Sequence, residues 1–156
     1  IFGHQERNYR GGTENVPYII GLGKAVDLIL NDNYEENIRL KNLRDYMEQQ
    51  IKEIISDVVI YGDLENRLPN TSSIAFKGVK ADELLLMLES FNIFISTGSA
   101  CNSEIALPSH VLTAMGIDNR LARSSLRISF GKENTEEDVE FLVDNLTEII
   151  KKLRRY

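Results

Sequence analysis

The 156-residue sequence has no tryptophan, three prolines and one cysteine. A single cysteine cannot form a disulfide within the chain, so the fold depends on its core. A domain of this length buries roughly 70% of its extended-chain surface without such a link. No apolar run approaches the roughly 20 residues that cross a bilayer, and no charged and then apolar leader opens the chain. We therefore expect a cytoplasmic globular protein with no membrane partner.

Positive charge is also scarce, because 18 Lys and Arg face 24 Asp and Glu, for a formal net charge of -6. A general nucleic-acid binder needs cations clustered over a broad face. The dense basic run from Lys151 to Arg155 instead suits the C-terminal end of a helix. The two histidines, His4 and His110, and the cysteine show no spacing of metal ligands. We expect no nucleic-acid partner and no metal site.

Apolar periodicity predicts most of the secondary structure. The first 15 residues show no sustained period and are expected to form a loop. Helices are expected at about 16–30, 33–54, 82–91, 109–115, 119–123 and 135–153, the last with Thr135 as its N-cap. Runs of β-forming residues predict strands at 58–61, 73–76, 93–95 and 126–130. This order predicts an α+β fold, in which helices cover one small sheet.

Cys101 lies in the stretch STGSACNS at residues 96–103. The segment from Gly98 to Pro108 is rich in Ser and has no period, which predicts a loop. A lone cysteine is more often a small buried apolar residue than a nucleophile, but a loop leaves a thiol within reach of a reagent. The loop supplies no cation that would favour the thiolate, so activation would have to come from the fold or from a bound molecule. Both interpretations of Cys101 stay open on the residues alone.

Arg127, in a predicted strand, also has two possible roles. Alternation places Leu126, Ile128 and Phe130 on one side of the sheet and Arg127 with Ser129 on the other. Such an arginine is most often a solvated surface residue. The alternative is a clamp for a carboxylate, which a guanidinium binds through two parallel hydrogen bonds.

Four stretches, taken together and in order, resemble one family. They are QER with GTENVP at residues 5–17, STGSACNS at 96–103, LPSHVL with AMG at 107–116, and ARSSLRISFG at 122–131. The match is to the C-terminal part of the cysteine desulfurases of the NifS and IscS group, within the class V aminotransferases. It spans essentially the whole chain, with the cysteine and arginine motifs at the family's separation.

The resemblance implies an enzyme of fold type I, the aspartate aminotransferase fold, that uses pyridoxal 5'-phosphate and works as a homodimer. Such enzymes convert L-cysteine to L-alanine and pass the sulfur, held as a persulfide, to an iron-sulfur scaffold or another acceptor protein. Carried over by position, Cys101 would be the nucleophile and persulfide carrier, and Arg127 would bind the substrate carboxylate. Thr13 resembles the threonine that reaches the cofactor phosphate of the other subunit.

The resemblance also implies that part of the site lies outside this chain. In the family, the lysine that forms the aldimine with the cofactor precedes the segment around Gln5, whereas the first lysine here is Lys24. We therefore expect a fragment that is inactive alone. Residues 1–15 would be a segment from the large-domain side, and residues 16–156 the small C-terminal domain with its connecting helix.

Two other interpretations compete with this one. The chain could be a standalone carrier or interaction domain that accepts a persulfide on Cys101 from another enzyme and needs no cofactor. It could also be a structural domain with a buried thiol, which rapid labelling of Cys101 in the folded state would argue against.

Overall fold

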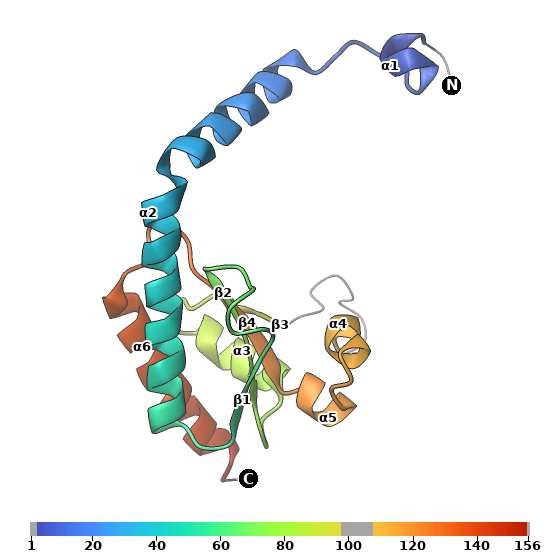
Figure 1. Ribbon diagram of the computed structural model, residues 1–156. Helices are drawn as coiled ribbons and strands as arrows, with labels where there is room; N and C mark the ends of the chain where they lie inside the picture. Colours follow the sequence, from blue (N-terminus) through green and yellow to red (C-terminus); the bar gives the residue numbers. More distant parts are fainter. Residues whose placement is uncertain (1–2, 98–107, 156) are drawn as a thin grey trace. The chain divides into compact units, whose positions relative to one another are not determined.

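The computed structural model describes residues 3–97 and 108–155, with only the backbone described at residues 31–33 (Figure 1). The described residues form two compact units, Ile1–Glu36 and Asn37–Tyr156. In chain order the elements are α1 (Gln5–Asn8), α2 (Val16–Ile54), β1 (Val58–Tyr61), β2 (Thr71–Phe76), α3 (Ala81–Glu89), β3 (Ser96–Thr97), α4 (His110–Ala114), α5 (Asn119–Ala122), β4 (Ser125–Ser129) and α6 (Glu136–Leu153). The expected α+β class is confirmed.

The N-terminal segment contains a tight turn where a loop was expected. Glu6, Arg7 and Asn8 have φ of 50°, 54° and 70°, in the left-handed region that side chains with a Cβ seldom adopt. The turn brings Gln5 and Arg10 together in an isolated antiparallel bridge, and Arg10 forms an ion pair with Glu14. Thr13 follows this turn and is exposed.

α2 is a single helix, so the expectation of two helices that meet at Asn33 was wrong. The stretch Asn31-Asp32-Asn33 contains neither proline nor glycine. Asn and Asp each cost less than about 1 kcal/mol inside a helix, too little to end a long one. None of the helices in residues 3–97 and 108–155 is long and apolar enough to cross a membrane.

The sheet has the order β1-β2-β4-β3, and every neighbouring pair is antiparallel. The expected strands at 58–61, 73–76 and 126–130 agree with β1, β2 and β4 to within two residues. The strand expected at 93–95 was wrong, because β3 comprises Ser96 and Thr97. The backbone N–H of Ile93 donates to the Leu88 carbonyl at 3.2 Å, which ties that segment to the end of α3 and not to the sheet.

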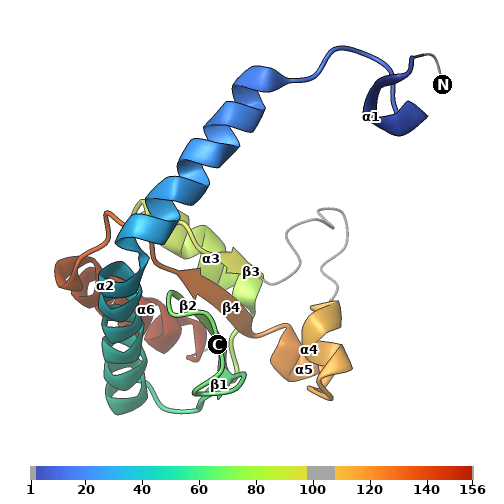
Figure 2. The same ribbon diagram turned by 45° about the horizontal axis from the view of Figure 1, so that its top comes forward.

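One face of the sheet carries the main core. The second half of α2 packs there with α3 and α6, while α4 and α5 lie on the other face (Figures 1 and 2). Met47, Ile51, Leu84 and Leu146 are fully buried in this core. The side of the sheet that faces α4 holds a smaller apolar cluster, formed by Tyr61, Ala75, Leu112 and Ala122.

A buried polar network joins α2 to the connection between β1 and β2. Glu48 accepts hydrogen bonds from both terminal nitrogens of Arg67, at 2.7 and 2.9 Å, and from Ser72 Oγ at 2.6 Å. Arg44, only 2% exposed, donates to the Leu68 carbonyl at 2.8 Å. These bonds hold the β1–β2 connection against the helix and so fix where β2 begins.

Candidate functional site

A row of four residues crosses the sheet on the face toward α4. The register pairs Tyr61 with Ser73, Ser73 with Arg127, and Arg127 with Ser96. Directly opposite residues of an antiparallel sheet share a face, with Cβ atoms about 5 Å apart. β1, β2, β4 and β3 thus each contribute one polar side chain to the same line.

Arg127 is the charged member of this row, and it is exposed. Its Nη2 donates to Ser96 Oγ at 3.4 Å, a long and weak bond, and it forms no ion pair among the described residues. Ser96 Oγ itself donates to the Thr97 carbonyl at 2.9 Å. The guanidinium therefore keeps most of its donors available for a ligand. The predicted alternation of β4 is confirmed, because Leu126 and Ile128 are buried on the opposite face.

A pocket of about 210 Å³ opens beside this row. Its polar lining includes Ser73, Arg127 and Ser109, and its apolar lining comes largely from Leu112 and Met115 of the α4 segment. A pocket of this small volume suits a ligand of amino-acid size. A guanidinium at the edge of a small, partly apolar pocket is a suitable site for a short carboxylate.

The described residues that flank the segment with Cys101 lie near Arg127 on one side and line its pocket on the other. Cys101 itself lies outside the described residues, so its side chain is not placed. The described chain stops at Thr97, next to the Ser96 that bonds Arg127, and resumes at Pro108, next to the Ser109 that lines the pocket.

Local hydrogen bonds stabilise the start of α4, where the described chain resumes after the segment that carries Cys101. Ser109 is the N-cap of α4, and its Oγ accepts from the backbone N–H of Leu112. The hydroxyl of Thr113 donates to the Ser109 carbonyl at 3.1 Å. α4 ends at Ala114, and Gly116, whose φ of 82° favours glycine, follows its C-cap Met115. The chain returning from Cys101 thus enters a capped helix.

Tyr61 also lines the pocket. It is 8% exposed, and its hydroxyl has no hydrogen-bond partner among the described residues. Burial raises the pKa of Tyr61, Ser125 nearby counteracts this in part, and the charge of Asp118 adds to the rise. Ser125 donates its own proton to the Leu121 carbonyl at 2.7 Å. Tyr61 is therefore a neutral phenol throughout the physiological range.

The sequence did not single out Ser73, Tyr61 or Ser96 as parts of a site. The alternation of side chains along a strand shows which residues of that strand lie on the same face of the sheet as each of these three. Their assembly around Arg127 depends on which strands pair and in what register, and local sequence patterns do not contain that information. Thr13 belongs to the other compact unit, Ile1–Glu36.

The described residues fit only some contacts of pyridoxal phosphate. Thr13 has an exposed hydroxyl that could donate to a phosphate, and Arg127 could hold a substrate carboxylate. The pocket has no lysine among its described lining residues, and its volume is below the roughly 300 to 1,000 Å³ of common small-molecule sites. The described pocket thus suits a substrate and does not by itself hold this cofactor.

Comparisons with known proteins agree with the fold and the motifs. The family profile for Aminotransferase class-V matches residues 1–142. A cysteine desulfurase of Gluconacetobacter diazotrophicus is 47% identical over 152 residues, which is 97% of this chain and 38% of that protein. The cysteine desulfurase IscS of Dictyoglomus turgidum is 44% identical over 152 residues, covering 97% of this chain and 39% of that protein.

Solved structures support the same relationship. The X-ray structure of a NifS-like protein from Rickettsia africae aligns with a TM-score of 0.84 at 36% identity, over 97% of this chain and 39% of that one. The chain therefore spans somewhat more than a third of the length of these relatives. With a family profile that covers most of its residues and a matching fold, the chain belongs to the class-V aminotransferase family.

Proposed function

We propose that this chain is the C-terminal small domain of a pyridoxal phosphate-dependent cysteine desulfurase. The observation that carries the proposal is the position of Arg127, which is exposed at a pocket of about 210 Å³, pairs with Ser96 in the sheet and shares the pocket with Ser109. A carboxylate anchor beside the residues that flank a cysteine-bearing segment suits an amino-acid substrate that gives up a sulfur atom. The matched relatives carry the name cysteine desulfurase.

Arg127 would bind and orient the substrate. Its planar fork can form two charge-assisted hydrogen bonds with the carboxylate of L-cysteine, which fixes the direction of the rest of the molecule. Leu112 and Met115 line the same pocket and exclude water from the carbon chain of the substrate. An arginine in this role needs no strong partner in the free protein, which fits its single long bond to Ser96.

Cys101 would take the sulfur. As a thiolate it attacks the sulfur atom of L-cysteine, a sulfur-sulfur bond forms, and the carbon-sulfur bond of the substrate breaks. The electron pair of the broken bond stays on carbon, which takes a proton and becomes the methyl group of L-alanine. The enzyme is left with a persulfide, and no external oxidant is required.

Pyridoxal phosphate, when bound, supplies the electron sink that makes this carbon-sulfur bond breakable. Thr13 is the residue of this chain that we assign to its phosphate, across a homodimer interface. We propose that the lysine that binds the cofactor lies outside these 156 residues. A cytoplasmic location and transfer of sulfur to an iron-sulfur scaffold or another acceptor protein complete the proposal.

Alanine formation tests the proposed function. The full-length protein with pyridoxal phosphate and L-cysteine should release L-alanine, and Cys101→Ala should abolish turnover while leaving cofactor absorbance unchanged. The 156 residues alone should form no alanine under the same conditions. A full-length protein that forms no alanine, or a Cys101→Ala variant that forms it equally well, contradicts the proposal. Steady turnover by the isolated chain contradicts the assignment of the cofactor lysine to another part of the protein.

A further inference from the structure

A hollow of the second unit lies away from Arg127. It has a volume of about 660 Å³ and runs between the β2–α3 connection and α5. We call it the basic groove, defined by Lys77, Lys80, Asp82, Asp118, Arg120 and Arg123 among its lining residues. None of these residues takes part in the proposed chemistry, so the groove has no assigned role.

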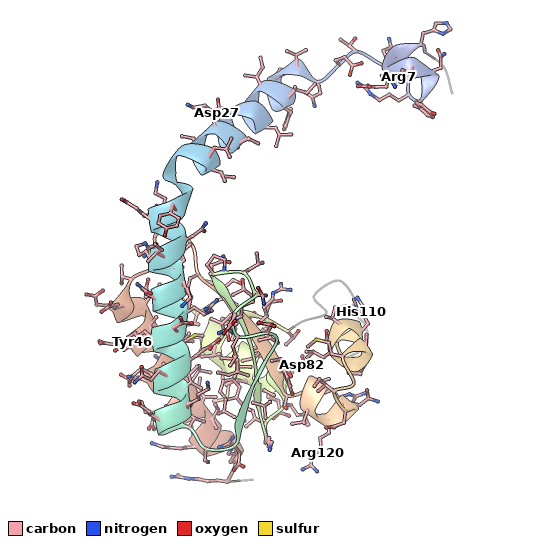
Figure 3. The ribbon with its side chains drawn as sticks, viewed as in Figure 1. Arg7, Asp27, Tyr46, Asp82, His110 and Arg120 are labelled. Carbon is pink, nitrogen blue, oxygen red and sulfur yellow. The ribbon has the colours of Figure 1, made fainter. Side chains whose placement is uncertain are left out.

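Three of the four cations of the basic groove are uncompensated. Lys77, Arg120 and Arg123 form no ion pair within residues 3–97 and 108–155, whereas Lys80 pairs with Glu83 at 2.8 Å. Acidic residues are in excess in this chain, at 24 against 18 basic ones. Cations that stay unpaired around one hollow of an acidic protein make a local positive site. Figure 3 shows Arg120 pointing away from α5 into solvent, where a partner can reach it.

The two carboxylates of the groove offset part of this charge, since four cations and two carboxylates line it. Asp118 is committed to α5, because its Oδ1 accepts from the backbone N–H groups of Arg120 and Leu121 at 2.9 and 3.1 Å. Asp82 lies in the first turn of α3, where a negative charge is favoured by the helix dipole. Each carboxylate therefore stabilises the N-terminal end of a helix, Asp118 that of α5 and Asp82 that of α3.

The walls of the groove are held by backbone bonds that do not depend on a ligand. The backbone N–H of Ala81 donates to the Arg123 carbonyl, and that of Phe76 to the Ser124 carbonyl, both at 3.0 Å. Gly78 makes the turn between β2 and α3 with a φ of 83°. The backbone that carries these cations is therefore already ordered without a ligand, which lowers the entropy cost of binding.

The positive surface continues beyond the groove toward the end of α6. Arg154 Nε donates to the Lys77 carbonyl at 3.1 Å, which places the basic last turn of α6 next to the groove. Lys151 and Lys152 belong to that turn, and Arg155 follows it. An extended partner in the groove would meet additional cations there.

We propose that the basic groove binds an acidic, extended segment of a partner protein. A hollow of about 660 Å³ is in the range of sites that enclose a ligand, and a segment bearing Asp and Glu would meet Lys77, Arg120 and Arg123 in succession. Such charge pairs mainly speed association and select partners. A single-stranded nucleic acid fits less well, since no aromatic residue stands among the described lining of the groove for bases to stack on.

A binding titration tests the proposal with the chain itself. A fluorescently labelled oligoglutamate peptide is titrated with the wild-type chain, with Lys77→Glu, with Arg120→Glu, and with the matched control Lys132→Glu. All three variants change the net charge equally, and Lys132 lies in the loop before α6. Each groove variant should weaken binding about fivefold, and the control by less than twofold. Binding should weaken as salt is raised.

Three results would overturn the inference: no saturable binding of oligoglutamate, equal losses in Lys132→Glu and the groove variants, or tighter binding of a single-stranded RNA of similar charge. Thermal melting of each variant confirms that it folds, which is expected for exposed side chains. The assay needs neither cofactor nor Cys101. Its outcome is therefore separate from that of the alanine assay, and either proposal can fail without the other.

Discussion

At the residue scale, Arg127 shows how a strand position becomes a candidate anchor. Alternation along β4 turns Leu126 and Ile128 into the core and leaves Arg127 on the face toward α4. The sequence predicted that face but could not choose between a solvated side chain and a carboxylate clamp. The pocket and the nearby ends of the Cys101 segment favour the clamp.

Replacing Arg127 by Lys keeps the positive charge and removes the bidentate fork. In the full-length protein we expect kcat/KM for L-cysteine to fall about 100-fold, which corresponds to roughly 2.7 kcal/mol, because one ammonium cannot reproduce two parallel bonds. Folding should be unaffected, since within residues 3–97 and 108–155 the Arg127 side chain makes one long bond. Ser129→Ala, two residues along the same face, is the control and should change kcat/KM little. A wild-type kcat/KM in Arg127→Lys would contradict the assigned role.

Glu48 should make the stability of the chain depend on acid pH. Burial pushes the pKa of Glu48 upward, but the bonds from Arg67 and Ser72 outweigh it and leave the pKa below its ordinary value of 4.5. A carboxyl with a depressed folded pKa stabilises the fold above its unfolded pKa. That contribution is lost as the pH falls from about 4.5 through the folded pKa.

Glu48→Gln should therefore lower the free energy of unfolding by about 3 kcal/mol near neutral pH, because it removes the closer of the two carboxylates that pair with the largely buried Arg67 and leaves only Asp45 at 3.8 Å. The difference from wild type should shrink as the pH is lowered below 4.5. Urea unfolding at several pH values measures both effects. Glu53→Gln, an exposed change on the same helix, is the control, and an equal loss there would show that Glu48 has no special role.

At the scale of elements, local patterns located most helices and strands but missed where two of them begin or end. The polar stretch at Asn33 suggested a break, yet α2 continues through it. The apolar residues Ile93 and Ile95 suggested a strand, yet they pack on the core while Ser96 and Thr97 pair with β4. Both errors arise because tertiary packing decides between local preferences that differ little in energy.

The start of α6 gives a test at this scale. Asp138 accepts a hydrogen bond from the backbone N–H of Thr135 at 3.1 Å, as a carboxylate in a capping box does. Asp138→Ala should lower the free energy of unfolding by about 1 kcal/mol, measured by urea titration. Asp144→Ala, at an exposed position in the middle of α6, should cost nothing or stabilise slightly, because Ala has the higher helix propensity. Equal losses would argue against a cap.

At the scale of the whole molecule, the α+β class followed from the order of predicted elements, but the strand order β1-β2-β4-β3 did not. That order brings Tyr61, Ser73, Arg127 and Ser96 into one row, although they lie up to 66 residues apart in the chain. Composition likewise gave a net charge of -6 without showing that unpaired cations gather at one groove. Both features depend on tertiary contacts.

The family motifs located Cys101 and Arg127 before any fold was known, and the fold adds a reason for their pairing. The chain leaves the described structure beside Arg127 and returns beside the same pocket. We propose that Cys101 takes its sulfur from a substrate held in this pocket.

The mass of the peptide that contains Cys101 tests this claim most directly. The full-length protein is mixed with L-cysteine and pyridoxal phosphate without an acceptor, quenched, digested without reductant and analysed by mass spectrometry. We predict that the Cys101 peptide gains the mass of one sulfur atom as one equivalent of L-alanine appears, and that Arg127→Lys slows both. Alanine formed without added sulfur on Cys101, or sulfur found on another residue while Cys101 stays unmodified, would contradict the account.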